Sequence, residues 1–390
     1  MDKHDDTRTV QSGPNAHKYE GAVTVPIFTT STFAFESSDA VEAYNRDPSG
    51  HYLYTRYANP TIVAVEQTVA DLERAEASLL FASGMAAITS SVLAIVRNGD
   101  KIVTTPSLYG GTRKFFRDIL PRYGIEVAFA PGNAVDDVRP LIDSRTKLLY
   151  LESPANPHAE VLDVKALAAT AKERGIVSAI DATFATPILM KPYVIGIDLV
   201  IHSCTKYLGG HADLIGGVVS SNLKTIKKVE EYRRTLGGVI DPEGASRVGR
   251  GLKTLAVRMD RHCANGMQVA QALQKSEKVT ELFYPGLPDS PWHTLAKEQM
   301  TGFGGMICLT LRGGLPSAKR FVDALRLIIN APSLGGVESL ASIPVLTSHV
   351  NMSPEELRLS RVNEGMVRLS IGIESATDLI ADVLQALAAV

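Results

Sequence analysis

The chain has little of what several classes of protein require. Its 390 residues include only three cysteines, none in a CxxC pair, so we expect neither a disulfide framework nor a metal site. No apolar run reaches the roughly 18 residues needed to cross a bilayer. A net charge of −2 gives no reason to expect nucleic acid or an anionic membrane as a partner. The polar, acidic N-terminus is unlike a secretory signal, so we expect a cytoplasmic protein.

Two nucleotide-binding motifs are also missing. Neither GxGxxG nor GxxxxGK(S/T) occurs, so dinucleotide-binding and P-loop functions lack support. The chain is instead 45% hydrophobic, which over this length allows a sizeable core and two domains.

Strand and helix patterns alternate along the middle of the chain, which predicts a mostly parallel sheet with helices on both faces. We expect an extended N-terminal arm (1–60), a large domain (61–253) and a smaller α+β domain (254–390). The expected helices are Thr61–Ala75, a helix from the Ala82–Ala86 turn to Val96, Thr112–Tyr123, Val164–Arg174, Arg261–Gln274, Ser317–Leu325 and Ala376–Leu387. The expected strands are Lys101–Thr105, Lys147–Glu152, Ile176–Asp181, Asp198–Ile201, Leu214–Ser220 and Met306–Leu311.

Lys206 lies between two of these apolar strands, just after the hydroxyl residues Ser203 and Thr205. Burying an ammonium group is costly unless it is paired or loses its proton. A desolvated lysine is an amine nucleophile suited to Schiff-base chemistry with a carbonyl compound or pyridoxal phosphate. A surface lysine on a turn is the equally weighted alternative from this segment alone.

Asp181 ends the strand before the one that leads to Lys206, so a single crossover connection would bring the two together. It would either cap the following turn or pair with a protonated pyridine nitrogen. Ser83 and Gly84 precede a helix whose first N–H groups form an anion site, although a simple serine N-cap is at least as common.

Four further side chains are candidates for binding. Tyr109 follows a strand and precedes two glycines, so its ring could stack on a planar cofactor, although loop tyrosines are ordinary. Tyr54 and Arg56 lie one residue apart on the arm and could clamp a phosphate, also across a subunit interface. Arg368 lies in an apolar strand-like run, where it needs an anion: a substrate carboxylate or a structural salt bridge.

Taken together, these segments resemble the Cys/Met-metabolism family of pyridoxal-phosphate (PLP) enzymes, from about Tyr19 to the C-terminus. The most specific block runs from His202 through Lys206 to His211. Further matching blocks, in order, are Tyr54-Thr-Arg with Asn59-Pro-Thr, Ala82-Ser-Gly-Met, Glu152-Ser-Pro-Ala-Asn-Pro, Asp181-Ala-Thr-Phe-Ala-Thr-Pro and Ser333-Leu-Gly-Gly-Val-Glu-Ser-Leu. The resemblance implies the α/β fold type I of aspartate aminotransferase: a large, mostly parallel seven-stranded sheet domain and a smaller C-terminal domain.

The resemblance also implies roles for individual residues. Lys206 would carry the cofactor as a Schiff base and act as the base, Asp181 would hold the pyridine nitrogen, and Tyr109 would stack on the ring and assist as an acid. Asn156 would approach the phenolic oxygen, whereas Ser333, Leu334 and Arg368 would bind the substrate. The other cofactor-binding residues would be Ser83, Gly84, Met85, Thr183, Ser203 and Thr205, joined by Tyr54 and Arg56 from a neighbouring subunit of a homotetramer.

The implied reaction is γ-replacement or γ-elimination on a small amino acid. Blocks such as Thr301-Gly-Phe-Gly-Gly look most like cystathionine γ-synthases, which predicts an O-activated homoserine and cysteine as substrates. Others look like methionine γ-lyases, and a methionine or cystathionine γ-lyase is the alternative; a catalytically silent scaffold is a remote one. Departures from the family pattern at Leu53, Gly111, Pro332 and residues 343–349 leave the substrate open.

Overall fold

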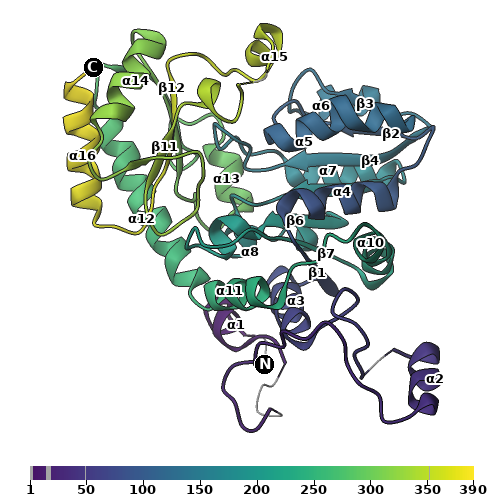
Figure 1. The fold of residues 1–390 in the computed structure, drawn as a ribbon. Helices are drawn as coiled ribbons and strands as arrows, with labels where there is room; N and C mark the ends of the chain where they lie inside the picture. Colours follow the sequence, from purple (N-terminus) through teal and green to yellow (C-terminus); the bar gives the residue numbers. More distant parts are fainter. Residues whose placement is uncertain (1–2, 15–18, 49, 351) are drawn as a thin grey trace.

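The computed structural model describes residues 3–14, 19–48, 50–350 and 352–390, and these form two sheets, each with helices packed against it. In Figure 1 the chain passes from the N-terminal segment at the bottom, through the larger sheet, to the smaller sheet and helix α16 at the left. The predicted two-part architecture of fold type I is therefore confirmed. The domain boundaries themselves stay a prediction.

The larger sheet has seven strands in the order β1-β7-β6-β5-β4-β2-β3. β7 runs antiparallel to both its neighbours, and the other neighbouring pairs are parallel, as the sequence predicts. The strands are β1 (Ala77–Phe81), β2 (Lys101–Thr104), β3 (Glu126–Phe129), β4 (Thr146–Glu152), β5 (Val177–Asp181), β6 (Leu199–Ser203) and β7 (Gly217–Ser221).

Helices cover both faces of this sheet, because alternate strand residues point to opposite sides and both sides are apolar. One face packs against α3, α7, α8 and α11, and the other against α4, α10 and the wide turn Phe115–Ile119. The helices of this part are α3 (Pro60–Glu73), α4 (Gly84–Ile95), α5 (Gly110–Lys114), α6 (Val135–Val138), α7 (Val164–Glu173), α8 (Thr186–Leu189), α9 (Pro192–Ile195), α10 (Leu223–Leu236) and α11 (Pro242–Leu252).

The smaller sheet has five strands in the order β10-β11-β12-β9-β8, and a separate apolar core lies between it and its helices. Its strands are β8 (Val279–Phe283), β9 (Met306–Leu311), β10 (Ile329–Asn330), β11 (Leu340–Ser342) and β12 (Met366–Ser370). Its helices are α12 (Leu255–Leu273), α13 (His293–Gln299), α14 (Gly314–Ala324), α15 (Pro354–Leu359) and α16 (Ala376–Ala388).

The structure differs from the predicted elements in several places, of which three matter most here. The helix expected over Thr112–Tyr123 is broken: α5 ends at Lys114, and a wide turn and then a tight turn containing Pro121 follow, because proline has no N–H to continue the helix. The arm is not wholly extended, since it contains α1 (Asp5–Gln11) and α2 (Ser38–Arg46). Strands β1 and β3 and helices α10 and α11 were not anticipated.

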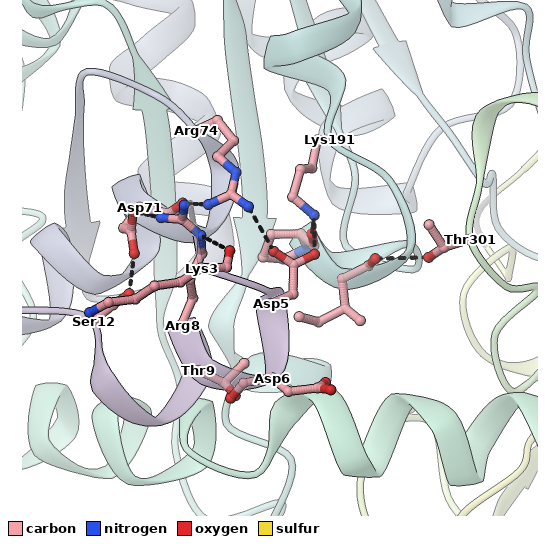
Figure 2. A network of polar contacts seen from close by, with 12 residues as sticks. Lys3, Asp5, Asp6, Arg8, Thr9, Ser12, Asp71, Arg74, Lys191 and Thr301 are labelled. Atoms are coloured by element: carbon pink, nitrogen blue, oxygen red, sulfur yellow. Dashed lines mark hydrogen bonds and ion pairs between the residues drawn. The ribbon is translucent and has the colours of Figure 1, made fainter. Parts of the chain in front are cut away.

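The start of the arm is fixed to the larger sheet's helices by ion pairs, which Figure 2 shows. Asp5 of α1 accepts from Arg74, at the end of α3, and from Lys191, just before α9. Arg8 pairs with Asp71 of α3. In contrast, α2 projects away from both sheets and has no residue that the chain itself buries.

Within the described ranges, no helix combines the length and apolar character required to cross a membrane. The same residues contain no group of three or more His, Cys, Asp or Glu side chains placed to hold a metal ion.

Candidate active site

A cavity of about 280 Å³ lies where β4, β5 and β6 end. β5 and β6 are parallel neighbours, so Asp181 and the segment after Ser203 meet at the same edge of the sheet, where α/β folds bind ligands. Twelve predicted site residues line the cavity: Ser83, Gly84, Met85, Tyr109, Asn156, Asp181, Thr183, Ser203, Thr205, Lys206, Leu334 and Arg368.

Lys206 points into this cavity from an irregular turn (204–208) directly after β6. Its Nζ lies 3.0 Å from the Ser333 hydroxyl oxygen. Burial, reinforced by the charge of Arg368, lowers the pKa of the lysine to about 8. The surface-lysine alternative is therefore wrong, and a substantial fraction of the amine is neutral near physiological pH.

Asp181 forms part of the cavity wall and is 7% exposed. Its Oδ1 accepts the Thr183 N–H at 3.0 Å and the Thr183 hydroxyl at 2.5 Å, so the capping role proposed as the alternative is real. Burial nonetheless raises the pKa of this carboxyl, and no ion pair neutralises it among the residues that the structure describes. Asp181 can therefore both cap its turn and receive a cationic group from the cavity.

The N-terminus of α4 forms another part of the cavity wall. The Ser83 hydroxyl accepts the Ala86 N–H at 3.0 Å, so Ser83 is an N-cap, as its alternative interpretation had it. A Cβ added at Gly84 would lie 3.1 Å from the Ser203 Cβ and Oγ, so glycine is needed for this close approach. Free N–H groups at a helix start, with the Ser203 and Thr205 hydroxyls also lining the cavity, suit a phosphate.

Arg368 of β12 reaches the cavity from the smaller sheet and is 5% exposed. It donates to the Asn156 Oδ1 at 2.9 Å and to the Ser333 carbonyl at 3.0 Å, while its Nε has no partner. Burial lowers the pKa of this guanidinium to about 10. Because no described residue forms an ion pair with it, the salt-bridge alternative lacks support, and the cavity offers a place for a carboxylate.

Tyr109 is 47% exposed and precedes α5. A Cβ added at Gly111 would lie 2.6 Å from Cε1 of this ring and 2.9 Å from the Met85 sulfur, so the ring lies directly over Gly111. Any larger residue at position 111 would have to displace the ring.

Tyr54 and Arg56 are not brought to the cavity within one chain. The Arg56 guanidinium lies 5.5 Å from the Tyr54 ring centroid and donates to the Arg234 carbonyl at 2.7 Å. Leu53 is likewise absent from the cavity lining among the described residues. The place of Tyr54 and Arg56 in a neighbouring subunit's site stays a prediction.

Sequence reasoning did not assign five other lining residues to the site: Ile88, Glu152, Pro154, Phe184 and Ile215. Pro332 and Ser348, which belong to the segments expected to line the substrate pocket, do line the cavity. Glu152 ends β4 in the same way that Asp181 ends β5, and the two are register partners. The signal that identified Asp181, an acid at the end of an apolar strand, would also have identified Glu152.

Comparisons with known proteins agree with this geometry. A family model described as "Cys/Met metabolism PLP-dependent enzyme" matches residues 6–388. The chain is 41% identical to a cystathionine β-lyase of Coxiella burnetii over 98% of each chain, and 38% identical to an L-methionine γ-lyase of Pseudomonas putida over 98% of this chain and 97% of that protein.

Two solved structures are also similar. One is metB from Corynebacterium glutamicum (TM-score 0.92, 38% identity, 99% and 98% of the two chains covered). The other is a cystathionine γ-lyase from Lactobacillus plantarum complexed with L-serine (TM-score 0.93, 35% identity, 99% of each chain).

Fold and site define a PLP-dependent enzyme of fold type I. The chain belongs to the Cys/Met metabolism PLP-dependent family, the trans-sulfuration enzymes. Its residues fit the cofactor: the buried Asp181 lacks a cation among the described residues, Lys206 is an amine of lowered pKa, and the start of α4 lines the cavity. Asp181 would hold the ring nitrogen, and Gly84 with Ser203 would hold the phosphate.

The lowered pKa of Lys206 predicts the pH at which the cofactor-free protein captures PLP. The capture rate should rise with pH and reach half its maximum near pH 8, because only the neutral amine attacks and burial favours that form. Stopped-flow absorbance at a series of pH values measures this. A midpoint near the ordinary lysine pKa of about 10.4 would show instead that the amine is solvated.

Proposed function

We propose that this protein is a PLP-dependent carbon–sulfur lyase that eliminates a thiol from an L-amino acid thioether, with L-methionine as the leading substrate. The observation that carries the proposal is that the cavity lining has two cationic side chains, Lys206 and Arg368, and several apolar ones. Arg368 can bind the substrate's carboxylate, and the Lys206 amine is available to act at its Cα. The rest of the lining includes the apolar side chains of Phe184, Ile215 and Pro332. A short, uncharged thioether side chain matches such a lining.

The same distribution argues against the synthase, which the sequence led us to expect first. A synthase that uses cysteine must also bind a second zwitterion. Among the described lining residues the only cations are Lys206 and Arg368, and both already have a task. The similar proteins support the lyase alternative too, since those compared by sequence are named as lyases.

Each site residue has a definite task in this proposal. PLP, when bound, supplies a carbonyl that condenses with amines and a protonated ring that withdraws electrons from the substrate Cα. The Lys206 Nζ removes the proton from Cα and, once it has given that proton up, a proton from Cβ, whose electron pair breaks the bond between Cγ and sulfur. The Asp181 carboxylate would keep the proton on the ring nitrogen. Arg368 fixes the substrate carboxylate, and the Tyr109 hydroxyl protonates the departing sulfur.

β-Elimination from L-cystathionine is the second candidate, and Gly111 favours it. Methionine γ-lyases resemble this chain but place a cysteine at that position, where any side chain would meet the Tyr109 ring. The cystathionine β-lyase of Coxiella burnetii is also the more identical of the two relatives compared above.

A substrate panel tests the proposal. L-Methionine and L-cystathionine are offered alone, and O-acetyl- and O-succinyl-homoserine are offered with and without cysteine. 2-Oxobutanoate with a thiol from methionine supports γ-elimination, and pyruvate from cystathionine supports the second candidate. Thioether formation from activated homoserine and cysteine, without turnover of either thioether, would refute the lyase proposal.

We propose further that the enzyme is a homotetramer in which Tyr54 and Arg56 complete the site of a neighbouring subunit. Arg56→Ala should weaken PLP retention roughly tenfold, the effect of losing a hydrogen bond to a charged group. At a PLP concentration too low to load Arg56→Ala, hybrids of Arg56→Ala and Lys206→Ala subunits should be more active than either variant alone, because one site per hybrid pair is then intact. Hybrids without any recovery would place Arg56 in its own chain's site.

A further inference from the structure

Glu152 is a buried carboxyl in the active-site cavity to which the proposed reaction gives no task. It is the last residue of β4 and is only 5% exposed. Its register partner across β4 and β5 is Asp181, so two carboxyls share one wall of the cavity. Burying two acids side by side is costly, which calls for a function that an apolar side chain would not serve.

The two oxygens of Glu152 bind two separate pieces of main chain. Oε2 accepts the Tyr109 N–H at 2.6 Å, and Oε1 accepts the Asn156 N–H at 3.1 Å. Tyr109 belongs to the loop before α5, whereas Asn156 belongs to the turn after β4. A single carboxyl thus joins two loops on opposite sides of its strand end.

Both loops carry a side chain that faces the ligand. Tyr109 presents its ring to the cavity, and Asn156 presents the Oδ1 that accepts from Arg368 at 2.9 Å. The Arg368 guanidinium is therefore connected to the main chain of Tyr109 through Asn156 and Glu152. We propose that Glu152 is a positioning residue, which fixes the Tyr109 ring and the Asn156–Arg368 pair relative to each other in the cavity that would hold the cofactor.

The charges around Glu152 are consistent with this role. Burial, and next the charge of Asp181, raise the pKa of Glu152, while the two N–H donors and the Arg113 guanidinium oppose the shift. The Tyr150 hydroxyl, two residues earlier on β4, has its pKa raised by burial and by the same two carboxyls. Glu152 accepts both N–H groups whether or not it is protonated, because each of its oxygens keeps a lone pair for its donor.

Glu152 acts as a clamp through its hydrogen bonds to the Tyr109 and Asn156 N–H groups. Hydrogen–deuterium exchange of the cofactor-free protein tests this clamp without any assumption about the reaction. In Glu152→Gln the amide nitrogen cannot accept, so one of the two main-chain N–H groups loses its partner. We expect exchange to accelerate roughly tenfold at Tyr109 or Asn156, and at both residues in Glu152→Ala. The visible circular dichroism of bound PLP, which reports on the ring's surroundings, should weaken in both variants and recover partly in Glu152→Asp.

Asp382→Asn provides a matched control. Asp382 is also a buried carboxyl that accepts main-chain N–H groups, those of Arg326, Leu327 and Ile328, but it lies in the smaller domain. Its variant should accelerate exchange only there and leave the dichroism unchanged. Unaltered exchange at Tyr109 and Asn156, or unaltered dichroism despite faster exchange, would overturn the proposal. If Glu152→Gln does not fold, the same two measurements are made on Glu152→Asp. Its shorter carboxyl reaches the two N–H donors less well, so both effects should be present but smaller.

The clamp and the lyase proposal fail in different ways. The clamp rests on the proposed function only for the presence of PLP in the cavity, which the family already establishes. Failure to turn over any thioether would refute the lyase and leave the exchange result to decide the clamp.

Discussion

Lys206→Ala is expected to lower turnover by roughly 10⁴-fold or more, because the variant loses both the amine that links the cofactor and the base that removes the Cα proton. The lysine is held for these tasks by its position: it follows β6, lies 3.0 Å from the Ser333 hydroxyl and has a pKa lowered to about 8. Steady-state assays of 2-oxo acid release, together with the loss of the borohydride-fixed cofactor on Lys206, measure both effects.

Two controls make this result specific. Lys227→Ala removes an exposed lysine of α10 and should leave turnover unchanged. Small primary amines such as methylamine should restore part of the activity of Lys206→Ala, because they can enter the space that the side chain vacates. Full turnover in the variant would mean that another group removes the proton.

Much of the site could be predicted because its parts are local in sequence. Asp181 and Lys206 follow successive apolar strands, and parallel pairing of neighbouring strands brings such ends together whatever the details of packing. Ser83 and Gly84 open a helix, and the cap that they form is likewise set by neighbouring residues. These features need only the alternation of strands and helices, which hydrophobic patterns reveal.

Other features could not be predicted because they depend on contacts between distant segments. The Glu152 carboxylate accepts the Tyr109 N–H at 2.6 Å from a loop 43 residues earlier in the chain, and no strand or helix pattern reveals such a contact. The place of Tyr54 and Arg56 in a neighbouring subunit's site stays a prediction, because the contacts within one chain do not bring them to the cavity.

Binding of the substrate's α-carboxylate depends most on Arg368, because it is the described cavity residue best placed to hold a free carboxylate. Arg368→Lys should lower kcat/KM for L-methionine on the order of 100-fold or more, mainly through KM, since a lysine cannot hold the carboxylate with two parallel hydrogen bonds and leaves Asn156 without its donor. Steady-state kinetics give the direction and its division between KM and kcat.

The methyl ester of the substrate identifies the group that Arg368 binds. Esterification should cost the wild-type enzyme a large part of its kcat/KM and cost Arg368→Lys much less, because the ester removes the charge that the arginine recognises. Arg258→Lys is the matched control: Arg258 is also buried and donates to main-chain carbonyls, those of Tyr207 and Gly251, but is not among the described residues lining the cavity. It should lower thermal stability while the penalty for the ester stays that of the wild type. If esterification lowers kcat/KM equally in Arg368→Lys and in the wild type, Arg368 does not bind the carboxylate. The substrate would then lie in the cavity in another orientation.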